Sequence, residues 1–330
     1  MGAIRIRLAD VSEGSQIVEM LNAAFKDESS FLPIERDLKW WKWKYEETPF
    51  GKPLISVADD DGKIAGAQIC WPWILTYAGH ELVTYQLVDT SVHPEYRGHG
   101  LFLKLTINSV KVSNEAYADL IFGFPNKNAL HGYLKLYYDK VFPMHWWIKA
   151  LKPLKLLDKK ARHASGRSIE LSTEYRITEE KVHEIRFANP YERKIQVKGS
   201  CDYVLWRYAK HPLYKYGIVF ERIKRSSCAV FEIRETINNY REMIVLEMFG
   251  SVKQYPEVLS ELLSIAKSFS VSMIAIVDSR DFESQAAFKQ KNFIRAKNKL
   301  FYTVPTKLEL ETLTSDVINW RLVAALHDAV

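Results

Sequence analysis

The chain lacks most of the features that mark disulfide-bonded, zinc-binding and membrane-spanning proteins. Its 330 residues contain three cysteines, Cys70, Cys201 and Cys228, which lie far apart and form no Cys-x-x-Cys pair. An odd number of widely spaced cysteines argues against a disulfide framework and against a zinc site. The cysteine usage therefore predicts a reducing cytoplasmic location. We expect no metal site, because no His-Glu-x-x-His pattern is present either.

Long apolar runs and the usual targeting signals are also missing. No stretch of about 18 apolar residues occurs, so we expect no transmembrane helix. Residues 1–6 have neither the apolar segment of a signal peptide nor the Ser or Thr that myristoylation requires at position 6. These absences again predict a cytoplasmic protein.

A strong charge of either sign is absent as well. The chain has 46 basic and 40 acidic residues, a net charge of +6, and 47% hydrophobic residues. This composition is ordinary for a globular protein that builds real cores, and the length predicts about two domains. The mild positive charge suits an anionic cofactor but does not by itself predict nucleic-acid binding.

What the sequence does contain is an anion-binding pattern in residues 85–105. Residues 85–92 are rich in strand-forming types, and His93-Pro94 ends the strand because proline has no N–H to donate to a ladder. Arg97-Gly98-His99-Gly100 is a short turn, and apolar residues recur at helical spacing from Leu101 onward. A helix that begins after a glycine turn presents free N–H groups and a dipole that favours an anion. The glycines allow a ligand to approach the backbone closely, and Arg97 adds positive charge.

The spacing of this turn excludes two common phosphate-binding loops. No Gly-Lys-Ser/Thr follows, as in a Walker loop, and the Gly-x-Gly-x-x-Gly of dinucleotide-binding proteins is absent. The segment Val92-His93-Pro94-Glu95-Tyr96-Arg97-Gly98-His99-Gly100 instead resembles the pyrophosphate-binding segment of the GNAT superfamily of acyl-CoA N-acyltransferases. Their pattern is a strand ending in Val-x-Pro, then Tyr-Arg-Gly-x-Gly, then a helix. The resemblance implies that acetyl-CoA binds at six residues, with His99 contributing only its backbone: Val92, Arg97, Gly98, His99, Gly100 and Leu101.

A second segment is similar to another signature of the same superfamily. Residues 120–124 form an apolar run typical of a buried strand, and Asn126 and a predicted helix over 129–138 follow. Tyr133-Leu134-Lys135-Leu136 fits the family's Tyr-x-Lys-x-Gly-Phe, although Tyr137-Tyr138 replaces Gly-Phe. The resemblance implies that Asn126 belongs to the cofactor site and that Tyr133 protonates the departing thiolate. The alternative is that Tyr133 only packs at the edge of the core.

The sequence leaves the general base open. Gln86 lies six residues before Val92, where one branch of the family carries Glu, and glutamine cannot accept the proton. Asp89 is the only carboxylate between Glu81 and Glu95. On a regular strand it points to the face opposite Gln86, unless a bulge changes the parity. Asp89, a base acting through water and the absence of a dedicated base all remain open, so Gln86 and Asp89 are both candidate catalytic positions.

The rest of the first half predicts a strand over residues 4–8, a helix, a second helix over 35–46 and antiparallel strands over 54–58, 63–77 and 81–92. The second helix contains Trp40-Trp41-Lys42-Trp43-Lys44-Tyr45. These aromatic residues are interpreted either as core with a lysine-coated outer face or as a wall for the acceptor.

The second half repeats the predicted order of helix, three strands, helix, buried strand and helix. Phe288-Lys289-Gln290-Lys291-Asn292-Phe293 resembles a degenerate second signature, whereas residues 250–256 lack Arg-Gly-x-Gly. We therefore predict an α/β (α+β) fold with two GNAT-like domains, each a mixed, mostly antiparallel sheet flanked by helices. The predicted boundaries are 1–148 for the acetyl-CoA-binding domain, 149–171 for a basic linker, and 172–330 for a degenerate domain with a C-terminal tail. The linker is interpreted either as solvated or as a contact for a phosphate-bearing partner.

The resemblance implies an N-acetyltransferase that transfers an acetyl group from acetyl-CoA to a primary amine of a small molecule. Aromatic density and modest charge favour an amino sugar or a similar amine. Two alternatives stay open: a catalytically inactive coenzyme A-binding regulatory protein, which Gln86 favours, and an aminoacyl or peptidyl transferase, which would need a positive groove for charged tRNA. The sequence leaves the acceptor, the length of the acyl group and the oligomeric state undetermined.

Overall fold

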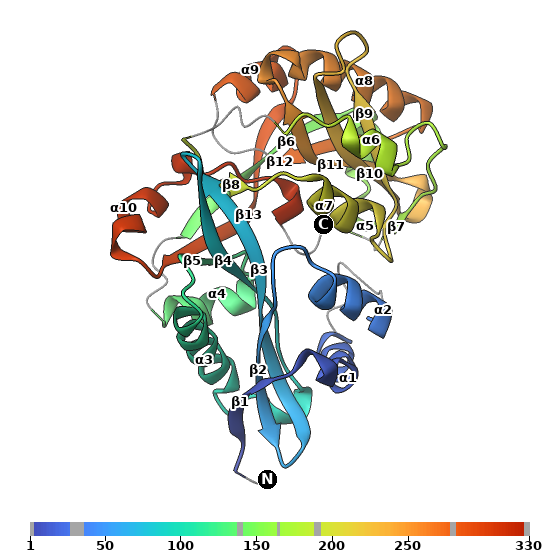
Figure 1. Ribbon diagram of the computed structural model, residues 1–330. Helices are drawn as coiled ribbons and strands as arrows, with labels where there is room; N and C mark the ends of the chain where they lie inside the picture. Colours follow the sequence, from blue (N-terminus) through green and yellow to red (C-terminus); the bar gives the residue numbers. More distant parts are fainter. Residues whose placement is uncertain are drawn as a thin grey trace. The chain divides into compact units, whose positions relative to one another are not determined.

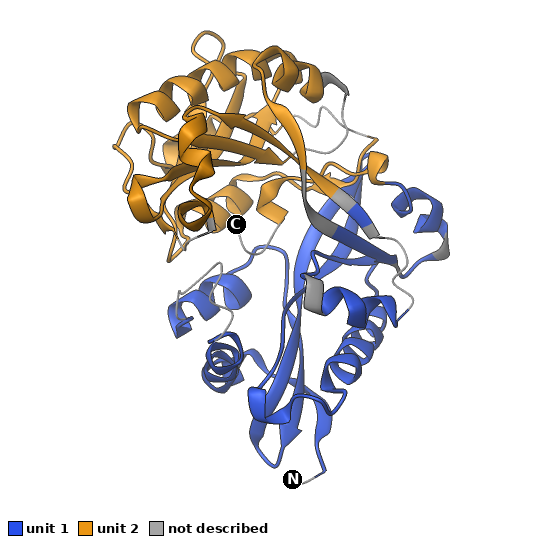
Figure 2. Cartoon of the chain, turned by 180° about the vertical axis from the view of Figure 1, so that it is seen from behind, with its two compact units in different colours: residues 1–29, 33–142, 299–316 blue, residues 30–32, 143–298, 317–330 orange. Residues whose placement is uncertain are grey.

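The computed structural model describes residues 3–26, 36–136, 141–163, 166–187, 193–277 and 282–326 (Figure 1). The chain divides into two compact units (Figure 2). Unit 1 contains residues 1–29, 33–142 and 299–316, and unit 2 contains residues 30–32, 143–298 and 317–330. Tyr137 and Tyr138, which replace Gly-Phe in the second signature, lie outside the described residues.

Unit 1 is a mixed sheet with helices on both faces. Its strands run in the order β1-β2-β3-β4-β5-β13, and of these pairs only β4–β5 is parallel. Helices α3 and α4 lie to one side of the strands, and α1 and α2 lie to the other (Figure 1). Its elements are β1 (Arg5–Ala9), α1 (Gly14–Phe25), α2 (Leu38–Trp41), β2 (Leu54–Asp60), β3 (Lys63–Tyr77), β4 (His80–Val92), α3 (Leu101–Glu115), β5 (Leu120–Gly123), α4 (Lys127–Leu134) and α10 (Glu311–Thr314).

Local sequence explains how the first helices of unit 1 begin. Asp10 accepts a hydrogen bond from the Ser12 amide and forms a capping box with Glu13, which leads the chain into α1. Asp37 caps α2 by accepting a hydrogen bond from the Trp40 amide at 2.7 Å. The predicted single helix over 35–46 is instead α2 followed by a π-helical turn over Lys42–Glu46.

The aromatic residues of this region are core, as one interpretation proposed. Trp41, Trp43 and Tyr45 are buried, with exposed fractions of 1%, 4% and 1%. Lys44 is also buried, with an exposed fraction of 1%. The expectation that the lysines of the predicted helix coat its outer face is therefore wrong for Lys44. The reason is that the wider π-helical turn carries Lys44 to the inner side with Tyr45.

Unit 2 has the same kind of mixed sheet. Its strands run β6-β12-β11-β10, with β7 and β9 both paired to β10, and of these pairs only β11–β12 is parallel. The predicted order of helix, three strands, helix, strand and helix is confirmed. The elements within or entering this unit are β6 (Val141–Ala150), α5 (Lys159–His163), β7 (Arg167–Ser168), α6 (Glu179–His183), β8 (Gln196–Val197), α7 (Cys201–Val204), β9 (Tyr216–Phe220), β10 (Ser227–Glu235), β11 (Arg241–Gly250), α8 (Tyr255–Ser268), β12 (Met273–Val277), α9 (Phe282–Gln290) and β13 (Ile294–Pro305).

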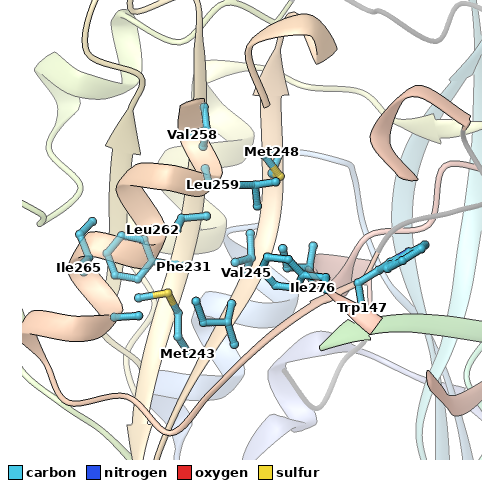
Figure 3. Packing of buried hydrophobic residues seen from close by; sticks show 14 of the residues in the cluster. Trp147, Phe231, Met243, Val245, Met248, Val258, Leu259, Leu262, Ile265 and Ile276 are labelled. Atoms are coloured by element: carbon cyan, nitrogen blue, oxygen red, sulfur yellow. The ribbon is translucent and has the colours of Figure 1, made fainter. Parts of the chain in front are cut away.

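The core of unit 2 lies between α8 and the sheet (Figure 3). Leu262 and Ile265 of α8 pack toward Phe231 of β10 and Met243 of β11, and all four side chains are nearly inaccessible to solvent. Burying each such side chain stabilises the fold by about 1.5–3 kcal/mol. Pro256 in the first turn of α8 fixes a helical φ without losing an intrahelical hydrogen bond.

The strand that follows each copy of the repeated order pairs in the sheet of the other copy, which the sequence did not predict. β6 follows the first copy of the repeated order, yet residues 146–150 pair with β12 of unit 2. β13 follows the second copy, yet residues 302–305 pair with β5 of unit 1. The compact units are therefore cut differently from the predicted domains 1–148 and 172–330. β13 thus completes the sheet of unit 1, and β6 completes the sheet of unit 2.

The predicted basic linker, residues 149–171, belongs to unit 2. It begins within β6 and contains α5 and β7. Lys152 and Lys155 donate hydrogen bonds to the carbonyls of Ser270 and Asn238 at 3.0 and 2.8 Å. These lysines hold the segment to its own unit, so it is not a free connector. Arg176 and Gly217 form an isolated antiparallel bridge.

Residues 317–326 pack into unit 2. Trp320, Leu322 and Leu326 each have an exposed fraction of 1%. These residues belong to the predicted C-terminal tail. Among the described residues, no helix is both long enough and apolar enough to cross a bilayer.

Candidate active site

A β-bulge interrupts β4 at the residue proposed as the base. The register between β3 and β4 shifts between Ala67 and Ile69, so that Asp89 and Thr90 together face the single residue Gln68. Asp89 has a φ of 48°, in the left-handed region. The first residue of one common kind of bulge has this conformation and is usually glycine. The bulge changes the parity of the strand, which was the condition for an active-site position of Asp89.

The ladder between β4 and β5 ends before the bulge. Their parallel pairing covers Thr84–Gln86 and Leu120–Phe122. β4 runs on to Val92, whereas β5 ends at Gly123. The backbone of the last six residues of β4 therefore extends beyond its ladder with β5. The edge of this stretch that faces away from β3 can bond the amide groups of an extended ligand arm.

The carboxylate of Asp89 is buried in a cluster of charged and aromatic groups. It accepts hydrogen bonds from Lys44 Nζ at 2.7 Å and from the Tyr45 hydroxyl, and Arg36 Nη2 lies 3.4 Å from its other oxygen. The side chains of both Lys44 and Asp89 are only 2% exposed. The Lys44 ammonium also lies 4.9–5.2 Å from the ring centroids of Trp40, Tyr45 and Trp71.

These contacts set the protonation of Asp89. Burial raises its pKa, but the charges of Lys44 and Arg36 and the hydrogen bonds from Lys44 and Tyr45 outweigh burial, and the pKa lies below its usual range. Asp89 is therefore an anion at neutral pH whose oxygens already have donors. Gln86 is buried on the paired part of β4, opposite Trp71. Its amide cannot act as a base, and a catalytic role for either residue stays a prediction.

Tyr133 lies at the opposite side of the same bulge. Its hydroxyl accepts a hydrogen bond from Gln68 Nε2 at 3.0 Å and lies 3.3 Å from Thr90 Oγ1. The ring is 3% exposed and packs 4.7 Å from the ring of Tyr302, so Tyr133 is also a core residue. Burial raises the pKa of Tyr133 against the hydrogen bonds that lower it. The hydroxyl thus keeps its proton at neutral pH, as a general acid must.

The predicted anion loop joins β4 to α3. Gly98 and Gly100 have φ values of 85° and 70°, and an added Cβ on either would meet no atom within 4 Å. Lys104 N donates to Gly100 O at 3.2 Å, so the amides of residues 101–103 precede the first of these helical bonds. The loop therefore presents backbone donors at an open, glycine-lined surface, as an anion site requires.

Neighbouring side chains hold this loop in place. Arg97 donates to the Ala24 carbonyl at 2.8 Å and to the Val92 carbonyl at 3.3 Å, so its charge is fixed between α1 and β4. The Tyr96 hydroxyl donates to Asp60 at 2.8 Å. His99 is exposed, which is compatible with a contribution from its backbone.

Asn126 has a structural function that the sequence did not predict. It caps α4 by accepting a hydrogen bond from the Ala129 amide at 2.8 Å. The structure thus brings Asp89, Thr90 and Tyr133 together at the bulge and places the Arg97–Leu101 loop at the end of the same strand. Contacts of Val92, Asn126 and the loop with coenzyme stay predictions.

Sequence reasoning missed the contacts of Lys44 and Tyr45 with Asp89, although a signal was present. Trp43-Lys44-Tyr45 is followed four residues later by Pro49, and Trp206-Arg207-Tyr208 is followed at the same spacing by Pro212. In both units a short α-helix passes into a π-helical turn that carries the basic residue and the tyrosine. A comparison of the two halves for this motif would have found both.

In unit 2 the corresponding motif, Trp206-Arg207-Tyr208, also contacts a carboxylate on a central strand, β11. Glu247 of β11 accepts hydrogen bonds from the hydroxyls of Tyr203 and Tyr208 at 2.9 and 3.0 Å. It lies three residues before the end of its strand, as Asp89 does, and next to a shift in register between β10 and β11. Burial raises the pKa of Glu247 more than the nearby Arg321, the two tyrosines and Arg207 lower it.

Unit 2 has no counterpart of the glycine loop after this strand. Gly250 has a φ of 88°, and a Cβ there would lie 2.0 Å from the carbonyl oxygen of Ser226. The chain then makes a single 3₁₀ turn and enters α8, with Pro256 in its first turn. The C-terminal segment covers the motif, since Arg207 donates to the carbonyl of Ala325 at 3.2 Å.

Within the described residues, no group of three or more His, Cys, Asp or Glu side chains is arranged to hold an ion.

Comparison with known proteins agrees with this geometry. Residues 5–139 match the model of the acetyltransferase (GNAT) domain family. No curated protein matches the sequence. Among solved structures, a probable N-acyltransferase of Enterococcus faecalis has a TM-score of 0.63 at 9% identity, covering 94% of this chain and 75% of that chain.

Two further structures share the fold at similarly low identity. A GCN5-related N-acetyltransferase of Anabaena variabilis has a TM-score of 0.59 at 12% identity, with 93% of this chain and 74% of that chain covered. The N-myristoyltransferase of Saccharomyces cerevisiae, solved with bound myristoyl-CoA, has a TM-score of 0.57 at 11% identity, with coverage of 92% and 82%.

The family match covers the whole stretch from β1 to the end of α4, including the bulge, the glycine loop and Tyr133. The likenesses to solved structures show the fold alone, and they extend over both units. Residues 5–139 therefore match the acetyltransferase (GNAT) domain family, and the chain has a fold of two GNAT-like units.

Proposed function

We propose that the chain is an N-acyltransferase that transfers an acetyl group from acetyl-CoA to a primary amine of a small molecule. One observation carries the proposal: the left-handed glycine loop follows, and the Tyr133 hydroxyl lies beside, the stretch of β4 that extends beyond its ladder with β5. A coenzyme whose pyrophosphate bound the loop would lay its pantetheine arm beside this stretch. The arm would direct the thioester toward the bulge.

The residues present can supply most of what acyl transfer requires. The amides of residues 101–103 and the Arg97 guanidinium would neutralise the pyrophosphate, and backbone N–H groups near the end of β4 would polarise the thioester carbonyl. As the amine attacks the carbonyl carbon, the bond to sulfur breaks. Tyr133 would give the departing thiolate its proton. The proton of the ammonium would leave to water, because Asp89 already has two close donors and Arg36 beside it.

The test is an acyl-transfer screen on the full chain. Acetyl-CoA is offered with panels of amines that include amino sugars, longer acyl-CoAs are tested in parallel, and release of free thiol is measured. We expect thiol release that depends on one class of amine, and binding of one coenzyme A per chain by calorimetry. Two coenzymes per chain would contradict the assignment of the anion site to unit 1 alone.

A specific observation favours a second candidate, a coenzyme A-binding protein without catalysis. Asp89, the acidic side chain at the bulge, is engaged with Lys44 and Tyr45, and Gln86 cannot act as a base. Binding of coenzyme A at the loop, together with no thiol release across the amine panel, would support this candidate over the enzyme.

A further inference from the structure

We propose that Lys44 and Tyr45 are positioning residues for acyl transfer. By holding the carboxylate of Asp89, they lock the β-bulge of β4, and the bulge fixes Thr90 and the backbone after it beside the thioester. This inference rests on the proposed function and deepens it. It makes Asp89 an anchor for the strand rather than the acceptor of a proton.

The first argument is the backbone of Asp89. Its φ of 48° lies in the left-handed region, which is unfavourable for a residue other than glycine. Aspartate and asparagine tolerate this region better than other residues. The conformation persists only where surrounding contacts offset its cost, and the contacts of the Asp89 side chain with Lys44 and Tyr45 can do so.

The second argument is that the next residue is held from the opposite side. Thr90 Oγ1 accepts a hydrogen bond from Gln68 Nε2 at 2.9 Å, and the same amide donates to the Tyr133 hydroxyl. The two residues of the bulge are thus fixed by two separate sets of side chains. Release of Asp89 would let the strand slip and move Thr90 relative to Tyr133, because a one-residue change of register reverses the side-chain faces.

The third argument comes from unit 2. There Tyr208, at the position that Tyr45 has in the repeated motif, also donates to a carboxylate beside a shift in register. Unit 2 has no Arg-Gly-x-Gly loop, yet it keeps this contact. A tyrosine–carboxylate contact that persists without the anion loop belongs to the architecture of the strand rather than to proton transfer.

The test compares three variants of the full chain: Asp89→Asn, Asp89→Ala and Lys44→Met. Asparagine keeps the size, an oxygen acceptor and the tolerance of a left-handed φ, whereas alanine keeps none of them. We expect amide hydrogen exchange in residues 87–92 to rise about 10-fold or more in Asp89→Ala and Lys44→Met and to stay near wild type in Asp89→Asn. Exchange in α3 checks that unit 1 remains folded.

Turnover distinguishes a positioning role from a purely structural role. We expect kcat to fall at least about 10-fold further in Asp89→Ala than in Asp89→Asn, with KM for acetyl-CoA nearly constant. The acid limb of the pH–rate profile should survive in Asp89→Asn. The matched control is Arg207→Met, which should raise exchange in residues 243–250 and leave residues 87–92 and turnover as they are.

Two results would overturn the inference. Wild-type exchange of residues 87–92 in both Asp89→Ala and Lys44→Met would show that the cluster does not lock the bulge. An Asp89→Asn variant with normal exchange, turnover as low as Asp89→Ala and no acid limb would identify Asp89 as the base. If the wild-type chain shows no turnover with any amine, the proposed function fails, and the exchange data alone decide whether the lock exists.

Discussion

Unit 1 and unit 2 each place a carboxylate beside a bulge near the end of a central strand, but only unit 1 continues that strand into a glycine loop. Asp89 is held by Lys44 and Tyr45, and Glu247 is held by Tyr203 and Tyr208. After β4 comes an open turn with two left-handed glycines. β11 ends at Gly250, where an added Cβ would collide with the backbone of Ser226.

The difference shows which parts of the repeat belong to the scaffold and which belong to the coenzyme site. The Trp-basic-Tyr motif, the π-helical turn and the buried carboxylate occur in both units. The anion loop occurs in one. Tyr45 and Tyr208 should therefore resemble each other in their effect on stability and differ in their effect on turnover.

The largest expected effect comes from filling the loop. Gly100→Val places a β-branched side chain at a φ of 70° and projects it into the open surface where a phosphate would approach. We expect coenzyme A binding to be lost by calorimetry while the far-UV circular dichroism stays native. Gly79→Val is the matched control, because Gly79 has a φ of 81° and open space but lies in a hairpin. Equal coenzyme affinity in the Gly100 and Gly79 variants would remove the loop from the binding site.

The next effect concerns Tyr133. Tyr133→Phe keeps the ring that packs on Tyr302 but removes the hydroxyl beside Thr90. Turnover should fall about 10²–10⁴-fold, as for loss of a general acid, with little change in coenzyme affinity. The loss should be smaller at low pH, where solvent can supply the proton. A variant of lower melting temperature with normal turnover would instead show that Tyr133 only packs.

A direct comparison of the two units uses Tyr45→Phe and Tyr208→Phe. Each removes a hydroxyl that donates to a buried carboxylate and should lower the free energy of unfolding by about 1–3 kcal/mol. We expect reduced turnover in Tyr45→Phe alone. Urea unfolding and thiol release are measured on both proteins. Equal loss of turnover in the two variants would refute the division between scaffold and site.

The smallest effect is a difference in pH dependence. The pKa of Asp89 is lowered, so its contribution to stability is present at neutral pH and is lost as the pH falls through the folded-state pKa. The pKa of Glu247 is raised, so its contribution is present at low pH and is lost as the pH rises through the folded-state pKa. Unfolding should show Asp89→Asn losing stability relative to wild type as the pH rises to about 4, and Glu247→Gln gaining stability relative to wild type as the pH rises above about 4.5. If the stability difference between variant and wild type changed with pH in the same direction for both variants, one of the two pKa directions would be wrong.

The sequence by itself determined the parts of this protein that depend on neighbouring residues. Alternating apolar residues predicted the three antiparallel strands of each unit, and the Arg97–Gly100 turn was recognisable because only glycine readily takes the φ values found there. Residues 250–256 identified the copy without that loop by the same reasoning.

Only the tertiary structure decided what depends on residues far apart in the chain. Lys44 and Arg36 reach Asp89 from 45 and 53 residues away, and the pKa of Asp89 follows from these partners rather than from its own strand. The pairing of β6 with β12 and of β13 with β5 likewise could not be predicted from the sequence. Hydrophobic alternation identifies a strand but does not specify which sheet edge it pairs with. Local patterns fix which residues form a strand, whereas the choice of its partner and the charges that surround a buried side chain are set by packing of the whole unit.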